Sequence, residues 1–189
     1  LNFSDLNREE NIDVERMFST HTRLAVVAKA GFGKTTLLKW AAVQLARHLP
    51  DLKVDSWQGK IPFFVQLRDY AKQALPTIAE LPMSLKATEI ELLEGSVPTN
   101  WSTKQIRAKR TIIFLDGLDE TNEPKRQEAL AWVEGILSLY PETVFIISGR
   151  PSAINKQEMQ PELQRLGFHF VTLKEMDEDM INQFVRQWH

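Results

Sequence analysis

A loop rich in small residues, positions 28–36 with the sequence AKAGFGKTT, follows an apolar run. Gly31 and Gly33 allow several backbone N–H groups to point inward at once, which a nucleotide's phosphate chain requires. Lys34 can reach the β- and γ-phosphates as a point charge, and Thr35 offers a hydroxyl to Mg²⁺. We predict that the phosphates are bound by Ala28, Gly31, Phe32, Gly33, Lys34, Thr35 and Thr36.

The first position of this loop departs from the pattern Gly-x-x-x-x-Gly-Lys-Ser/Thr, because Ala28 stands where glycine is usual. That position closes the preceding strand, so we expect a methyl group to be tolerated there. A helix that begins near Lys34 adds the positive end of its dipole to the same site. The loop therefore predicts a binding site for a nucleoside polyphosphate.

A second apolar run, residues 112–115, delivers Asp116 at its C-terminal end. Ligands of open α/β sheets bind at that edge, and a carboxylate there is favourable beside a cation. We predict that Asp116 completes the Mg²⁺ site with the loop hydroxyl. Many hydrolytic NTPases have a glutamate directly after this aspartate, whereas here Gly117 follows and the acids return at Asp119 and Glu120. Either acid could orient or deprotonate the attacking water, and spacing does not choose between them.

A third apolar run ends in the sequence ISGRP, which places Arg150 directly after a strand. Its guanidinium would lie at the same sheet edge as Asp116 and Lys34, where a planar donor fork can sense the γ-phosphate. Taken alone, Arg150 is explained equally well as a residue that caps the strand end or pairs with a surface acid. We predict catalytic roles for Asp119, Glu120 and Arg150.

The elements that must position these residues alternate along the chain. Continuous apolar runs, typical of strands buried on both faces, occur at 23–28, 61–67, 111–115, 143–148 and, more weakly, 168–173. Apolar residues at helical spacing predict helices over 37–45, 84–94, 129–140 and 177–188. We therefore predict a three-layer α/β fold of the P-loop NTPase class, with a central, mostly parallel sheet of about five strands.

The composition narrows the classes of function. The 189 residues carry 23 Lys and Arg against 25 Asp and Glu, for a net charge of −2, and include no cysteine. These values exclude disulfides and thiolate metal sites and argue against broad electrostatic binding to nucleic acid. No apolar stretch approaches the ~20 residues that span a bilayer, so we expect no membrane partner and a cytoplasmic location. We interpret the basic cluster of Lys104, Arg107, Lys109 and Arg110 as a solvated helix face rather than part of a nucleic-acid motor.

Four segments together resemble the NACHT family of signal-transduction ATPases (the STAND class). They are the loop AGFGKTT, the acidic segment LDGLDE, the segment SGRP and the run IPFFVQLR. In that family a small residue follows the Mg²⁺ aspartate and a distal acidic pair comes next, which Gly117, Asp119 and Glu120 match. The family more often has Thr-Ser-Arg where this sequence has SGRP. The resemblance covers residues 20–188.

The resemblance implies a regulatory ATPase that ADP holds closed and that opens and self-assembles when ATP replaces ADP, with slow Mg²⁺-dependent hydrolysis. Residues 1–22 would form a lead-in segment with an adenine contact within 6–18, and residues 23–189 the NTPase core. Because the sequence begins at Leu1 rather than Met, we interpret it as an excerpt of a longer multidomain protein. Adjoining helical and winged-helix domains would help to clamp the nucleotide, and without them we expect weak affinity and slow turnover.

Three other functions share parts of this pattern. Residues 155–158, NKQE, are similar to the guanine-recognising Asn-Lys-x-Asp but end in Glu, and Asp119 rather than Gly stands three residues after Asp116. This disfavours a small GTPase, while GTP binding stays open. A kinase or metabolic phosphotransferase would not need the distal acidic pair. The main alternative is a non-hydrolytic switch, in which ATP binding alone drives assembly.

Overall fold

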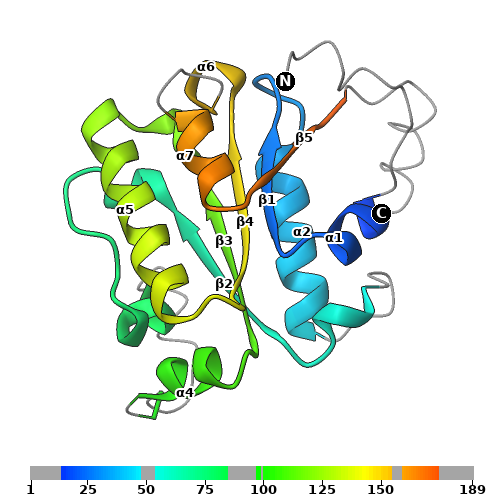
Figure 1. The fold of residues 1–189 in the computed structure, drawn as a ribbon, viewed down its shortest axis with the longest axis vertical. Coiled ribbons are helices and arrows are strands. Elements are labelled where there is room, and N and C mark those ends of the chain that lie inside the picture. The colour runs from blue at the N-terminus through cyan, green and yellow to red at the C-terminus, as the bar shows by residue number, and fades with distance from the viewer. Residues whose placement is uncertain (1–13, 48–53, 85–96, 99, 155–158, 175–189) are drawn as a thin grey trace.

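The computed structural model describes residues 14–47, 54–84, 97–98, 100–154 and 159–174. At its centre lies a five-stranded sheet in the order β2-β3-β4-β1-β5, in which every neighbouring pair is parallel (Figure 1). The strands are β1 (Arg23–Val27), β2 (Ile61–Gln66), β3 (Thr111–Asp116), β4 (Val144–Gly149) and β5 (His169–Thr172). The five predicted strands are confirmed, and their ends shift by at most one residue.

Helices connect the strands. The α-helices are α1 (Val14–Thr20), α2 (Lys34–Arg47), α4 (Trp101–Arg107), α5 (Glu123–Leu139), α6 (Pro151–Ile154) and α7 (Met159–Arg165). The 3₁₀ helices are η2 (Asp55–Trp57), η3 (Leu67–Tyr70), η4 (Ile78–Ser84) and η5 (Leu118–Glu120). In the described ranges, no helix combines the length and the apolar character needed to cross a membrane.

The two helices predicted over 37–45 and 129–140 are confirmed, and both begin earlier than the apolar pattern indicates. The first helical residue of α2 is Lys34 itself. The side chain of Asn122 accepts a hydrogen bond from the N–H of Lys125 at 3.1 Å and so caps α5 ahead of its apolar stripe. The helix predicted over 177–188 lies outside the described residues, as does that over 84–94 apart from Ser84 in η4.

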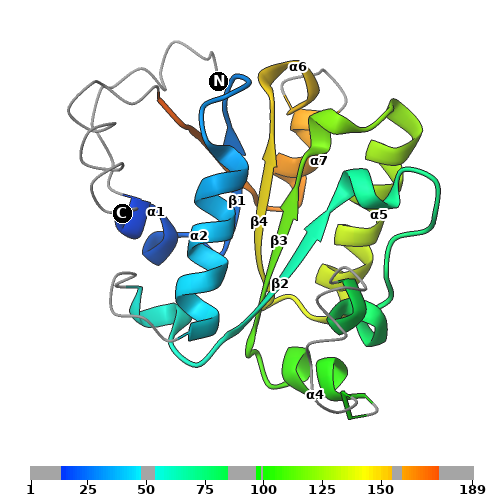
Figure 2. The same cartoon turned by 180° about the vertical axis from the view of Figure 1, so that it is seen from behind.

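The sheet is covered on both faces, which gives the three predicted layers. Side chains alternate along β1, so that Leu24 and Val26 pack in the cluster containing α1 and α2, whereas Ala25 and Val27 pack with α5 and α7. Figures 1 and 2 show α2 on one face of the sheet and α5 with α7 on the other. All residues of β3 and β4 are buried, which explains their continuous apolar sequences.

The strand order determines which loops meet. Because the strands are parallel, their C-terminal ends share one edge of the sheet, and β4 lies between β1 and β3. Val27 pairs with Gly149 and Leu115 pairs with Ile147 in the ladder. The glycine loop after β1, the acidic turn after β3 and the segment after β4 are therefore neighbours.

Candidate functional site

The glycine loop joins β1 directly to α2. Gly31 and Gly33 have φ angles of 81° and 78°, a region that residues with a Cβ rarely adopt. A Cβ built on either glycine would meet no atom within 4 Å, so the glycines are required by the backbone while the space above the loop stays open. The carbonyl of Gly33 accepts a hydrogen bond from the N–H of Leu37 at 2.8 Å, so α2 begins at the end of the loop. A loop of this shape suits a polyphosphate.

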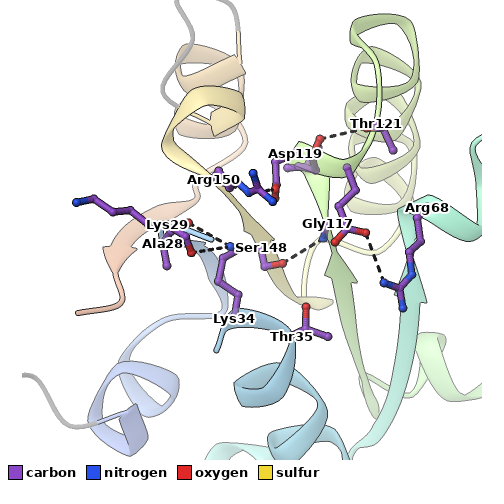
Figure 3. A network of polar contacts seen from close by, with 12 residues as sticks. Ala28, Lys29, Lys34, Thr35, Arg68, Gly117, Asp119, Thr121, Ser148 and Arg150 are labelled. Carbon is purple, nitrogen blue, oxygen red and sulfur yellow. Dashed lines mark hydrogen bonds and ion pairs between the residues drawn. The ribbon is translucent and has the colours of Figure 1, made fainter. Parts of the chain in front are cut away.

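Lys34 and Ala28 are connected across the loop. The Nζ of Lys34 donates hydrogen bonds to the carbonyls of Ala28 at 3.1 Å and Lys29 at 3.2 Å (Figure 3). The N–H of Ala28 continues the sheet by donating to the carbonyl of Gly149 at 3.2 Å, and Ala28 is buried in the core. The methyl group of Ala28 therefore faces the packed interior, which accounts physically for alanine at the first position of the pattern.

Asp116 is held by hydroxyl groups from two directions. Its Oδ2 accepts a hydrogen bond from the Thr35 hydroxyl at 2.9 Å, and its Oδ1 accepts one from the Ser148 hydroxyl at 2.5 Å. The Ser148 oxygen in turn accepts the N–H of Gly117 at 3.1 Å, which fixes the direction of the serine proton. Asp116 and Ser148 are both buried. Sequence reasoning predicted the Thr35 and Asp116 pair but gave no role to Ser148.

The oxygen ligands at this point fit Mg²⁺. Thr35 and Asp116 bring a hydroxyl and a carboxylate together, which are hard oxygen donors. In the described part of the chain no three His, Asp or Glu side chains converge on one point. A sparse set of protein ligands suits Mg²⁺, because this ion usually keeps several waters and takes other ligands from substrate phosphates.

The two distal acids have different surroundings. Asp119 pairs with Arg150, the Oδ2 to Nε distance being 2.7 Å, and its Oδ1 accepts the backbone N–H of Arg150 at 3.1 Å. Glu120 faces the other way, toward the end of β2, where its Oε2 lies 3.8 Å from Nη1 of Arg68. Figure 3 shows Arg150 and Arg68 on opposite sides of the acidic turn. Arg150 thus pairs with one of the two predicted catalytic acids, whose side chain is buried, and its role toward the γ-phosphate stays a prediction.

These side chains surround one cavity of about 260 Å³. Its lining consists of Ala30, Gly31, Gly33, Lys34, Thr35, Thr36, Asp116, Gly117, Asp119, Glu120 and Arg150. Two predicted phosphate-loop residues, Ala28 and Phe32, belong to the loop but do not line the cavity. The structure therefore brings the remaining predicted site residues together around a single space.

The predicted adenine contact falls mostly outside the described residues. Its described part lies in α1, where Met17 and Phe18 are buried. The ring centroid of Phe18 lies 4.5 Å from that of Trp57, so this side chain belongs to the core beneath the sheet. The adenine contact stays a prediction, as does the boundary between 1–22 and 23–189. The NKQE segment, residues 155–158, also lies outside the described residues.

A glycine loop between a buried strand and a helix, with a lysine and a hydroxyl beside an acidic strand end, defines the P-loop NTPase class. Residues 22–189 match the NACHT domain. Since this match covers most of the sequence, the chain belongs to the NACHT domain family, as its motifs predicted. It is accordingly a nucleotide-binding NTPase module.

Solved structures with a similar fold come from distant proteins. A Walker-type ATPase of Pyrococcus abyssi aligns with a TM-score of 0.52 and 14% identity, over 92% of this chain and 55% of that one. AMPPCP-bound DnaA from Aquifex aeolicus has a TM-score of 0.47 and 14% identity, over 87% and 43%. Cdc6p from Pyrobaculum aerophilum has a TM-score of 0.48 and 13% identity, over 87% and 42%. The chain thus spans about half the length of these proteins. None of the curated proteins compared with it matches.

Proposed function

We propose that this chain is an ATP- and ADP-binding regulatory NTPase domain that works as a nucleotide-dependent conformational and oligomerisation switch, with slow Mg²⁺-dependent ATP hydrolysis. One observation carries the proposal: the hydroxyl of Thr35, at the start of α2, and the carboxylate of Asp116, at the end of β3, meet at 2.9 Å beside an open glycine loop. Membership in the NACHT domain family supports the same function.

Each side chain around the cavity has a distinct part in the proposed reaction. Lys34 and the loop N–H groups bind the β- and γ-phosphates. Thr35 and Asp116 hold Mg²⁺, which would supply positive charge next to the transferred phosphoryl group. Arg150 binds the γ-phosphate and so distinguishes ATP from ADP. One of the two distal acids orients the attacking water.

Lys34→Ala tests the binding role. We expect the affinities for ATP and ADP to fall by about a hundredfold or more, because charge-assisted hydrogen bonds contribute about 1.5–3 kcal/mol each. Calorimetric titration of the full-length protein measures both affinities, and circular dichroism checks that the fold is retained. Lys39→Ala, an exposed lysine of the same helix α2, is the matched control and should bind as the wild type does. Unchanged nucleotide affinity in Lys34→Ala would show that the role of Lys34 is wrong.

The second candidate function is a switch that binds ATP without hydrolysing it. The structure offers a specific reason to consider it, because both distal acids are engaged in ion pairs, Asp119 with Arg150 and Glu120 with Arg68. Phosphate release from the full-length protein separates the two functions. A hydrolytic domain releases phosphate with Mg²⁺-ATP and loses that activity on alanine substitution of its water-orienting acid. A purely binding switch shows no release above background in any form.

The switch itself predicts nucleotide-dependent assembly. We expect the full-length protein to be smaller in solution with ADP than with the ATP analogue AMPPCP, which light scattering after gel filtration can measure. We also propose that adjoining helical and winged-helix domains help to clamp the nucleotide. The proposed location of the protein is cytoplasmic.

A further inference from the structure

The acidic turn η5 offers its two carboxylates to different neighbours. Both oxygens of Asp119 are used by Arg150: one accepts the backbone N–H at 3.1 Å, and the other lies 2.7 Å from the guanidinium Nε. The Asp119 side chain is only 6% exposed, whereas the side chain of Glu120 is 38% exposed. Glu120 approaches its partner Arg68 no closer than 3.8 Å. The two adjacent acids are therefore not equivalent.

This difference matters for the chemistry. An acid that orients or deprotonates water needs a carboxylate oxygen that water can reach. Both oxygens of Asp119 already serve short, charge-assisted contacts in a buried position, which are among the stronger hydrogen bonds in proteins. Glu120 retains solvent access and makes a long, exposed ion pair, which is a weak interaction. Of the two acids, Glu120 is the one whose surroundings suit water.

The segment that carries Arg150 runs close to η5 just before the pair with Asp119. A Cβ on Gly149 would come within 2.8 Å of Cδ1 of Ile154 and 3.2 Å of Cβ of Leu118. The end of β4 therefore passes close to Leu118 of η5, and a side chain at position 149 would crowd both Leu118 and Ile154. At the next residue, the backbone N–H of Arg150 lies within hydrogen-bonding distance of Asp119.

We propose that Asp119 is a positioning residue for Arg150 rather than the acid that acts on water. A guanidinium is rigid and planar, so anchoring its Nε and the backbone N–H of the same residue restricts the direction of its two Nη groups. The ion pair is made through Nε, and the side chain that carries the two Nη groups lines the cavity with Lys34 and Thr35. The inference rests on the proposed function, and it makes the Asp119–Arg150 pair the part of the site that distinguishes a triphosphate from a diphosphate.

A double-mutant cycle tests this inference. In the full-length protein, the affinities for AMPPCP and ADP are measured by calorimetry for the wild type, Asp119→Ala, Arg150→Ala and the double variant. We expect each single variant to lower the AMPPCP-to-ADP affinity ratio by roughly five- to tenfold, in the range of ordinary coupling between sites. The double variant should show no further loss, because Asp119 acts through Arg150.

Two further variants control the experiment. Glu162→Ala removes a carboxylate from another short ion pair, 2.8 Å from Arg165 on α7, and should leave the ratio unchanged. Asp119→Asn keeps oxygen and shape without the charge, so the ratio should lie between those of the wild type and Asp119→Ala. If Asp119→Ala loses its native circular dichroism spectrum, the cycle is carried out with Asp119→Asn instead.

Contrary results are equally clear. A wild-type ratio in Asp119→Ala, or effects of the single variants that multiply in the double variant, would overturn the inference while the proposed function stands. A wild-type protein that binds neither AMPPCP nor ADP would overturn the proposed function and the inference with it.

Discussion

At the scale of single residues, Ser148 determines how Asp116 is presented. The N–H of Gly117 donates to the serine oxygen, and the serine hydroxyl donates to Oδ1 of Asp116. Only Oδ2 of the carboxylate then faces Thr35. Groups that hydrogen-bond to a metal-binding side chain typically orient it, and their loss usually weakens metal binding by about 10–100-fold.

Asp116→Asn should abolish the Mg²⁺ dependence of nucleotide binding and leave nucleotide binding itself in place, because Lys34 and the loop amides remain. Calorimetric titrations with ATP in Mg²⁺ and in EDTA measure this dependence. We expect Ser148→Ala to act in the same direction, with affinity for Mg²⁺-ATP lowered by about tenfold and affinity in EDTA nearly unchanged. A wild-type difference between Mg²⁺ and EDTA in Asp116→Asn would contradict the metal role.

The pair of Thr35 and Asp116 could be predicted from the sequence, whereas the partners that Ser148 and Arg68 find at the site could not. Lys34 and Thr35 follow from a local pattern, and Asp116 follows from its position at the end of an apolar strand. Ser148 is the second-to-last residue of β4 and Arg68 comes two residues after the end of β2, and their position at the ends of apolar runs was the available signal. Their partners depend on the order and register of β2, β3 and β4, which no local pattern contains.

At the scale of elements, the turn between β3 and α5 is firmly anchored. The Thr121 hydroxyl donates to the carbonyl of Leu118 at 3.1 Å, and Arg126 of α5 donates to the carbonyl of Thr121. Arg126 also pairs with Glu123 at 2.6 Å. Because Gly117 starts this turn with a φ of 88°, the position of the distal acids depends on a backbone shape that favours glycine.

Gly117→Ala should therefore cost about 1–2 kcal/mol of unfolding free energy, the usual penalty for a left-handed residue with a Cβ. The added Cβ would lie 3.2 Å from Cδ of Glu120, so phosphate release should fall as well. Gly135→Ala in α5 is the matched control, because nothing lies within 4 Å of its Cβ position and the helix gains about 0.5–1 kcal/mol. Urea denaturation measures both changes. Equal effects of the two substitutions would refute this account.

Strands were predictable from the sequence because burial on both faces leaves a continuous apolar run. The segment after β2 was not predictable, because distant side chains hold it. Lys125 donates to the carbonyl of Gln73 at 2.6 Å, and the indole N–H of Trp132 donates to the carbonyl of Pro76 at 2.7 Å. Both donors lie on α5, more than 50 residues away in the sequence. Such a segment has no periodicity of its own to detect.

At the scale of the whole molecule, we expect a pair of stacked histidines to make stability depend on pH. His21 precedes β1 and His169 begins β5, and their ring centroids lie 4.0 Å apart. Burial, and then the neighbouring His169, lower the pKa of His21 from its ordinary value of 6.5. Between the lowered pKa and 6.5, the unfolded chain therefore binds more protons than the folded chain.

The free energy of unfolding should thus fall as the pH is lowered from 6.5 toward the pKa of folded His21, and be fully retained above 6.5. Thermal melts between about pH 5 and pH 8 measure the trend. His21→Gln should flatten it, and His169→Gln should weaken it less, because burial is the larger cause. An identical pH profile in His21→Gln would rule out this source of the dependence.

The loops at the two ends of the parallel strands differ in how well they should tolerate an insertion. The turn between α5 and β4, at Pro141 and Glu142, is exposed and lies at the N-terminal end of β4, opposite the cavity. Exposed loop tips of this kind accept inserted chain far better than packed elements do. We therefore expect a fluorescent reporter or affinity domain inserted into this turn to leave the conformation of the glycine loop unchanged.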